Sequence, residues 1–199
     1  MLGEQPLLGV VLAGGASRRM GQDKAQLQVR GRRLLDHMLA LLRDCGIDDC
    51  VVSGAHQGYR CVADLHEGAG PMSALHALAQ ALPDSRLLIV AVDMPAIRVT
   101  WLQHLLNTAP RSRCLHFTGA PLPLRLDTDA FTRDALGDLM TRCQPSQRSL
   151  QNLLLALSAD AQAWPTDFDP RTLAECNTPS EWQAMLELIS QSQRSPYSD

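Results

Sequence analysis

A glycine-rich, basic segment near the start of the chain has the residue types of a phosphate-binding loop. Gly14 and Gly15 stand next to each other, and the cations Arg18, Arg19 and Lys24 follow within ten residues. Adjacent glycines let backbone N–H groups converge on an anion, and the cations add charge within reach of a polyphosphate. Lys24 is the only lysine, whereas arginine occurs 17 times. A compact, flexible ammonium at this one position favours a role in following a phosphoryl group.

Four apolar runs are the elements that would position this loop. Leu7–Leu12 leads straight into it without polar alternation, which is typical of a strand buried on both faces of a parallel sheet. Three further runs have the same character: Cys50–Val52, Cys61–Asp64 and Arg86–Asp93. Parallel strands bring their carboxyl ends to one edge, where open α/β sheets bind ligands. We therefore predict that the loop and the ends of these runs meet at that edge.

Two of the runs end on a carboxylate, Asp64 and Asp93. Mg²⁺ takes one or two protein carboxylates and fills its remaining positions with phosphate oxygens and water. An acid at the carboxyl edge beside a phosphate loop fits that requirement, so we predict that Asp93 is a metal ligand. The alternative is an aspartate that only opens the turn at Met94-Pro95.

Apolar residues at helical spacing predict the helices that connect the strands, beginning with 34–42 and 71–82. Pro121 and Pro123 predict that their extended segment lies at a sheet edge or a bulge. Four patterns predict helix starts: a cap at Asp129, a cap at Ser149, and capping boxes at Thr100–Gln103 and Thr178–Glu181.

Composition limits the class of protein. The chain has 199 residues, of which 45% are hydrophobic and 20% charged, which suits one globular α/β domain. A net charge of −3 argues against general nucleic-acid binding, since the basic residues cluster only around the loop. No signal peptide or membrane-spanning run is evident, and the six cysteines are scattered. We expect reduced thiols in a cytoplasmic protein that does not bind membranes and works as a monomer.

Several common motifs are excluded by spacing. The spacing of Gly21 and Lys24 does not fit G-x-x-x-x-G-K-[ST], so the sequence has no Walker loop. It also contains no G-x-G-x-x-G, the fingerprint of dinucleotide-binding domains. The six histidines form no H-E-x-x-H pair, and no G-x-S-x-G elbow occurs. We expect these histidines to be surface or core residues.

The segment Leu12–Lys24 resembles the L-A-G-G-x-S-x-R-M-G-x-D-K signature of nucleotidyltransferases that activate a phosphorylated acceptor with an NTP. Within that superfamily it is most similar to the molybdenum cofactor guanylyltransferases, which join GMP from GTP to molybdopterin. The resemblance implies a three-layer α/β/α domain with a mostly parallel sheet, the Rossmann-like, GT-A-like nucleotidyltransferase fold. It also implies Mg²⁺ as cofactor, GTP and molybdopterin as substrates, and partner proteins of molybdenum cofactor biosynthesis or molybdoenzymes.

The resemblance also assigns roles to matching positions. Lys24 would bind the phosphates and Asp93 would hold the metal; together with Arg18, whose charge comes from the loop itself, they would act in catalysis. The positions that would bind the nucleotide are Leu12, Ala13, Gly14, Gly15, Lys24, Ser53, Asp64 and Asp93. We expect residues 1–190 to form one domain, with the nucleotide half at 1–100 and the acceptor half at 101–190. The polar residues 191–199 are expected to be a disordered tail.

Three positions depart from the family pattern. Ser53 stands where the guanylyltransferases commonly carry an asparagine that recognises base or ribose, Ala74 replaces a glycine, and Glu175 replaces an asparagine. They leave open a cytidylyltransferase for molybdopterin or a transferase for a sugar or polyol phosphate. A further alternative, from another class, is a nucleotide-binding regulatory protein without turnover. The family pattern at Gly14-Gly15 and the Asp23-Lys24 pair favour GTP.

Overall fold

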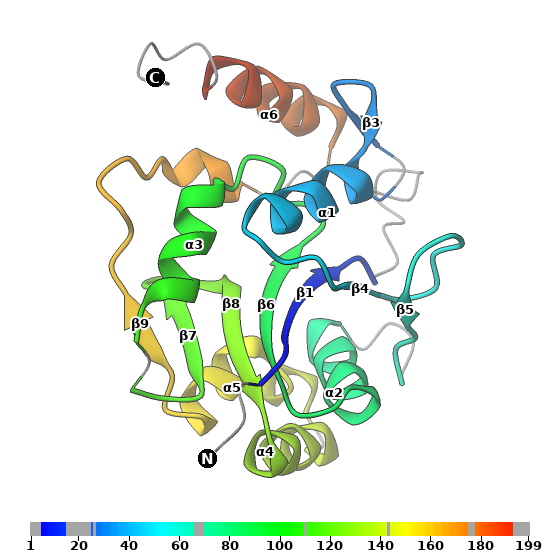
Figure 1. Cartoon of the computed structure of the whole chain (residues 1–199), viewed down its shortest axis with the longest axis vertical. Helices are drawn as coiled ribbons and strands as arrows, with labels where there is room; N and C mark the ends of the chain where they lie inside the picture. The colour runs from blue at the N-terminus through cyan, green and yellow to red at the C-terminus, as the bar shows by residue number, and fades with distance from the viewer. Residues whose placement is uncertain are drawn as a thin grey trace.

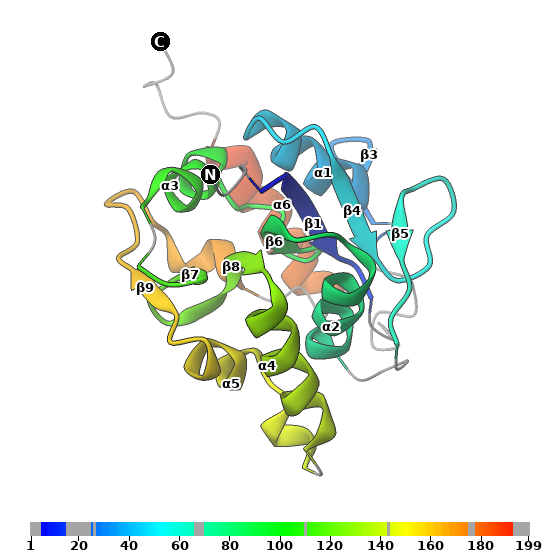
Figure 2. The same cartoon turned by 60° about the horizontal axis from the view of Figure 1, so that its bottom comes forward.

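The computed structural model describes residues 5–14, 25, 27–65, 70–109, 111–142, 144–174 and 178–192. These residues form three layers, with a twisted sheet between two sets of helices (Figures 1 and 2). Within the described chain the sheet has seven strands in the order β5-β4-β1-β6-β8-β7-β9. A separate two-stranded hairpin, β2-β3, follows the glycine-rich segment. The three-layer α/β expectation is confirmed.

The predicted strands are present and pair in parallel at the centre of the sheet. β1 lies between β4 and β6 and is parallel to both. Among the described strands of this sheet only β8 runs in the opposite direction, since it pairs antiparallel with β6 and with β7. The strand bounds are β1 Leu7–Leu12, β2 Gln28–Val29, β3 Arg32–Arg33, β4 Cys50–Ser53, β5 Cys61–Val62, β6 Ser85–Ala91, β7 Cys114–Phe117, β8 Ala120–Thr128 and β9 Asp160–Gln162.

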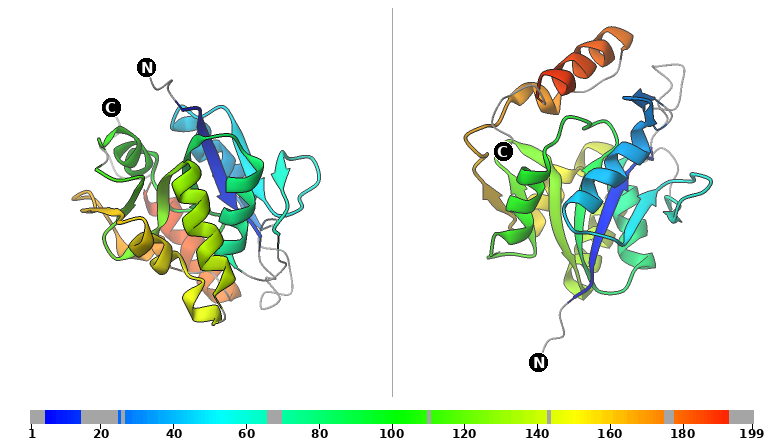
Figure 3. Two further views of the ribbon diagram at one scale, coloured as in Figure 1. Left: turned by 90° about the horizontal axis from the view of Figure 1, so that it is seen from below. Right: turned by 45° about the horizontal axis from the view of Figure 1, so that its top comes forward.

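Helices cover both faces of the sheet, each over its own buried apolar cluster. Side chains of α1, α3 and α6 pack on one face, and those of α2, α4 and α5 pack on the other. Figure 3 shows α2 and α4 side by side on the second face. The helix bounds are α1 Leu34–Asp44, α2 Pro71–Ala81, α3 Val99–Asn107, α4 Ala130–Thr141, α5 Leu150–Ala156 and α6 Pro179–Ser192, with short 3₁₀ turns η3 Pro145–Gln147 and η4 Pro170–Leu173.

Three of the four predicted helix starts are confirmed. Asp129 Oδ1 accepts from Thr132 N at 2.9 Å, and Ser149 Oγ accepts from Asn152 N at 3.3 Å. In the capping box before α6, Thr178 N donates to Glu181 Oε2 at 2.8 Å and Glu181 N to Thr178 Oγ1 at 3.2 Å. All three follow the expected exchange between a short polar side chain and unpaired helix amides.

The predicted capping box at Thr100–Gln103 is not formed, so this prediction is wrong. Helix α3 begins at Val99 with Arg98 as its N-cap, and the Arg98 side chain forms no capping hydrogen bond. The buried indole of Trp101, 0% exposed, anchors the first turn, and Trp101 N donates to Arg98 O at 3.1 Å. Tertiary packing therefore starts the helix earlier than the local polar signal.

The prolines of β8 lie where its pairing is irregular, not at a sheet edge. β8 lies inside the sheet, but its pairing with β6 stops at Leu124, one residue after Pro123. Its register with β7 shifts between His116 and Phe117, opposite this proline segment. Of the two predicted explanations, the structure has the bulge, because proline lacks the N–H that regular pairing needs.

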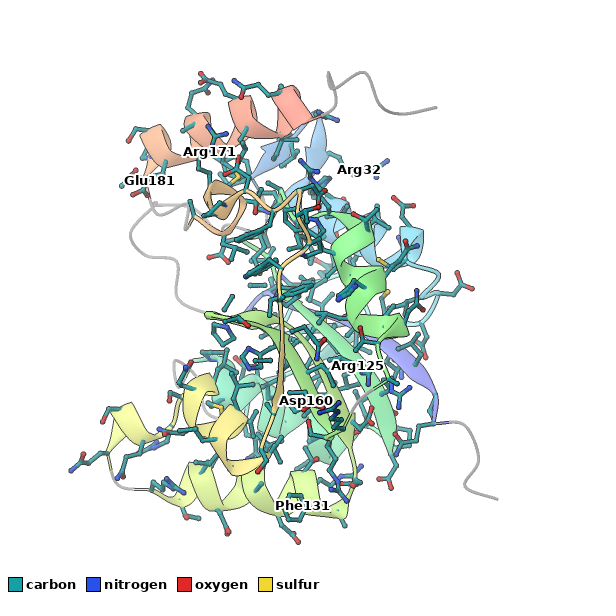
Figure 4. The ribbon with its side chains drawn as sticks, turned by 90° about the vertical axis from the view of Figure 1, so that its left-hand side faces the viewer. Arg32, Arg125, Phe131, Asp160, Arg171 and Glu181 are labelled. Atoms are coloured by element: carbon teal, nitrogen blue, oxygen red, sulfur yellow. The ribbon has the colours of Figure 1, made fainter. Side chains whose placement is uncertain are left out.

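One arginine is buried beneath α3. Arg125 on β8 is 2% exposed, and its Nη1 donates to the carbonyls of Leu105, Leu106 and Thr108 at 2.8, 3.1 and 2.7 Å. Figure 4 shows Arg125 in the interior of the molecule, with Asp160 nearby. The guanidinium thus satisfies carbonyls that the last turn of a helix leaves unpaired.

Two other expectations concern the thiols and the end of the chain. Cys45, Cys50, Cys61 and Cys114 are free thiols, and Cys114 is buried; the other two cysteines lie outside the described residues. Helix α6 continues to Ser192, over the first two residues of the expected tail. No helix within the described ranges is long and apolar enough to cross a membrane.

Candidate functional site

The carboxyl ends of the central strands form one edge of the sheet. Leu12 is paired in register with Ser53 on one side and with Ala91 on the other. Ser53 is in turn paired with Val62. These four residues therefore form a row, and the segments that follow them leave the sheet together. The predicted edge is present.

The Ser53 side chain holds the start of the glycine-rich segment. Its Oγ accepts hydrogen bonds from Ala13 N at 3.1 Å and Gly14 N at 3.3 Å, and the residue is 0% exposed. Two of the amides that leave β1 are therefore taken by the protein itself. Any anion bound by backbone amides of this segment must use those that follow Gly14.

Asp64 lies directly against Gly14. A Cβ placed on Gly14 would stand 2.6 Å from Asp64 Oδ2, so only a glycine permits this approach. Asp64 Oδ1 is buried and has no hydrogen-bond partner among the described residues. Burial raises the pKa of this carboxyl group. A carboxylate kept this close to the loop without a donor is suited to receive one from a ligand.

Gly54 is the second place where the edge requires glycine. Its φ is +93°, a conformation that side chains rarely adopt, and its N–H donates to Val62 O at 2.9 Å. A Cβ on Gly54 would stand 3.4 Å from the Gly14 Cα. The turn after β4 therefore packs closely on the turn after β1, on the side where Asp64 arrives.

Asp93 enters the same edge from the other side of β1. It is the second residue after β6, and Val92 N donates to Leu12 O at 3.0 Å, which fixes the first step of this turn to the end of β1. Asp93 itself is half-buried. The structure thus brings Leu12, Ala13, Gly14, Ser53, Asp64 and Asp93 to one edge, while Gly15, Arg18 and Lys24 lie outside the described residues.

The donor set at this edge fits a hard cation that is shared with a ligand. Among the described residues no three His, Cys, Asp or Glu side chains gather as they would in an all-protein metal cage. Asp93 and Asp64, with its buried unpaired oxygen, are the carboxylates that the strands deliver here. Mg²⁺ is commonly held by one or two carboxylates together with substrate phosphates.

The comparison with family models agrees with this geometry. The model described as the MobA-like NTP transferase domain matches residues 9–162, which run from Gly9 within β1, through the edge residues, to the end of β9. The chain belongs to this family. It is a nucleotidyltransferase.

Relatives and solved structures extend the match of this MobA-like transferase beyond that domain. A protein named molybdenum cofactor guanylyltransferase from Xanthomonas euvesicatoria pv. vesicatoria is 40% identical over 184 residues, 92% of this chain and 96% of its own. The fold is similar to molybdopterin-guanine dinucleotide biosynthesis protein A from Archaeoglobus fulgidus, with a TM-score of 0.67 at 20% identity over 92% and 99% of the two chains. A manganese complex from Mycobacterium tuberculosis H37Rv is also similar, with a TM-score of 0.63 at 20% identity over 92% and 98%.

Two histidines of the MobA-like domain lie nearer to the site than the sequence indicates. His56 Nε2 would stand 3.3 Å from a Cβ on Gly54, so the imidazole borders the turn against Gly14. His37 on α1 contacts the turn that carries Asp93, through Pro95 O. Neither belongs to a ligand-spacing motif, and no local pattern reveals them, because both contacts depend on how separate segments pack.

Proposed function

We propose that this chain transfers GMP from GTP to molybdopterin and releases pyrophosphate, forming the guanine dinucleotide form of the molybdenum cofactor. The observation that carries the proposal is the close approach of Asp64 to Gly14 beside the turn that bears Asp93. The name of the 40% identical relative supports the choice of substrates. On this proposal the enzyme acts as a monomer in the cytoplasm, where the free thiols of the described cysteines would persist.

The reaction needs no protein nucleophile. An oxygen of the molybdopterin phosphate attacks the α-phosphorus of GTP in line, the bond from that phosphorus to the bridging oxygen breaks, and pyrophosphate leaves. Catalysis then consists of holding the two phosphates in place and neutralising charge that grows on the leaving group. A bound Mg²⁺ would supply Lewis-acid stabilisation of phosphate oxygens.

We assign the roles of the chain's own residues accordingly. Asp93, and Asp64 across the edge, would hold the metal–nucleotide complex, while Arg18 and Lys24 would neutralise the departing pyrophosphate. The segment from Leu12 to Gly15 would bind the nucleotide. Ser53 would serve it by fixing the amides of Ala13 and Gly14, with which its hydroxyl is paired. The manganese-bound structural relative supports a divalent cation in this fold.

The first test measures which nucleotide binds and reacts. The full-length protein is heated with GTP, CTP, ATP or UTP, with and without Mg²⁺, and pyrophosphate release is then measured with molybdopterin. We expect GTP with Mg²⁺ to raise the melting temperature most, because a ligand that binds only the folded state stabilises it by mass action. Preferential stabilisation and turnover with CTP would show that the nucleotide is misassigned. Binding of GTP with no pyrophosphate released would favour a regulatory protein.

The second test removes the single lysine. Lys24→Ala is expected to keep the fold and to lose roughly 2–4 kcal/mol of transition-state stabilisation, a factor of tens to hundreds in turnover. Lys24→Arg keeps the charge and should recover only part of the rate, because a planar guanidinium follows a moving phosphate less well. Wild-type turnover in Lys24→Ala contradicts the assigned role.

A further inference from the structure

His37 links helix α1 to the turn that follows β6. Its Nε2 lies 2.9 Å from Pro95 O, across 58 residues of sequence. A carbonyl oxygen only accepts, so Nε2 carries the proton and donates it. Burial lowers the pKa of His37, the hydrogen bond to Pro95 O raises it, and the charges of Arg32 and Arg30 lower it.

The turn that receives this bond carries Asp93 two residues before Pro95. Two backbone hydrogen bonds close this turn: Met94 N donates to Ala91 O at 3.3 Å, and Ile97 N donates to Met94 O at 3.1 Å. Met94 and Ile97 are 7% and 3% exposed, and both belong to the buried cluster on the α1 face of the sheet. The side chains of Met94 and Ile97 thus pack the turn onto the buried cluster. His37, on the neighbouring helix α1, adds a directional hydrogen bond to the backbone of the turn.

Helix α1 is in turn hydrogen-bonded to a residue that follows the glycine-rich segment in the sequence. Leu34 N, at the first residue of the helix, donates to Leu27 O at 2.7 Å. Ala25, which directly follows Lys24, is 1% exposed and belongs to the same buried cluster as Met94. Ala25 and the turn with the aspartate therefore both pack into the buried cluster to which α1 contributes.

We propose that His37 is a positioning residue that, through its hydrogen bond to Pro95 O, holds the turn that bears Asp93 against helix α1. The inference rests on the proposed function, in which the ammonium of Lys24 and the carboxylate of Asp93 serve the same triphosphate. Displacement of one group by about 1 Å can cost a hundredfold in rate. Loss of the directional hydrogen bond between helix α1 and the turn that bears Asp93 should therefore have a measurable effect on the rate.

The test uses two amide side chains that differ in reach. Glutamine places its amide nitrogen close to the position of the imidazole Nε2, whereas asparagine is one methylene shorter and cannot reach Pro95 O. The full-length variants His37→Gln and His37→Asn are compared with wild type. His104→Asn is the control, because His104 is an exposed histidine on α3 that stacks on Phe117, and among the described residues its side chain forms no hydrogen bond with the turn.

Two measurements separate positioning from a general loss of structure. In the protein without metal or nucleotide, amide hydrogen exchange at Met94, Ala96 and Ile97 is expected to quicken about tenfold in His37→Asn. In the pyrophosphate assay the Mn²⁺ concentration for half-maximal rate is expected to rise by about the same factor. His37→Gln should restore both values to near those of wild type, and His104→Asn should leave them unchanged.

The outcomes decide between the explanations. Unchanged exchange and metal dependence in His37→Asn would overturn the inference, and so would a lower melting temperature without any change in the Mn²⁺ requirement. Failure of His37→Gln to restore both values would assign the effect to the ring and not to the donor. If wild type releases no pyrophosphate, the proposed function fails, and the exchange comparison still decides whether His37 holds the turn.

Discussion

Asp64 is a carboxylate in surroundings that favour its neutral form. Burial raises its pKa in the folded chain, so over the range between the ordinary and the raised value the folded state binds more protons than the unfolded state. Folding stability therefore falls as pH rises through that range. Near neutral pH the ionised side chain costs stability, which is consistent with the binding role that we propose for it.

Asp64→Asn is expected to raise the melting temperature near neutral pH by about 2 °C, because it removes the buried charge. The gain should shrink as the pH falls toward the range in which an ordinary aspartate titrates, since wild type is then also neutral at this position. Melting curves over an acidic to neutral series measure the difference. The control is Asp48→Asn, an exposed residue, which should show no such pH-dependent gain. A loss of stability at every pH would contradict the expectation.

Some residues of the candidate site could be predicted from local sequence patterns, whereas contacts that depend on the packing of separate segments could not. Asp64 and Asp93 follow from apolar runs that end on an acid, and the shared edge follows from parallel strands. The partners of Ser53 Oγ could not be predicted, because a hydroxyl pairs with whichever amides the neighbouring strand presents. The contact of His37 with Pro95 depends on helix packing and leaves no local signal.

At the scale of elements, the C-terminal end of helix α3 depends on a side chain from strand β8. Its final carbonyls are satisfied by Arg125 Nη1 on β8, at 2.7 to 3.1 Å. Burial lowers the pKa of Arg125. The C-terminal end of a helix favours a cation there, so the macrodipole offsets part of the desolvation cost.

Arg125→Met is expected to destabilise the protein by about 2–4 kcal/mol, because it leaves several buried carbonyls without a donor. Equilibrium unfolding in denaturant measures the change. Arg113→Met is the matched control: its side chain is 50% exposed and pairs with Asp129 at 2.5 Å, so the loss should stay below about 1 kcal/mol. Equal losses in the two variants would show that the buried contact is not the cause.

Element boundaries were predictable where the local signal and the packing agree. Thr178 and Glu181 form their capping box, whereas the same spacing at Thr100 lies inside α3 because Trp101 packs the turn earlier. The prolines of β8 correctly predicted irregular pairing. Their sequence could not distinguish an edge from a bulge, because that depends on which strand lies alongside.

At the scale of the whole molecule, the two expected halves share one sheet. β6 from the first half pairs with β8 from the second over five residue pairs, from Ser85–Thr128 to Ile89–Leu124. Each buried cluster also contains residues from both halves. Cutting the chain near residue 100 would therefore expose a central strand and divide both clusters, which favours a single folding unit.

We predict one cooperative unfolding transition. The three tryptophans, Trp101, Trp164 and Trp182, all lie in the second half, so their fluorescence reports on that half, whereas far-UV circular dichroism reports on both. The two denaturant curves should coincide. Tyr59→Trp adds a probe to the first half and should give the same midpoint. Separate midpoints would show two independently stable units.

Because β8 runs antiparallel to β6, its C-terminal end lies at the edge of the sheet opposite the Gly14 edge. Its last residue, Thr128, pairs with Ser85 at the start of β6, so the turn into α4 emerges opposite the Gly14 edge. Phe131 lies there, 53% exposed (Figure 4). A cysteine introduced at Phe131 would offer an attachment point for a fluorophore or a solid support that leaves the Gly14 edge open to solution.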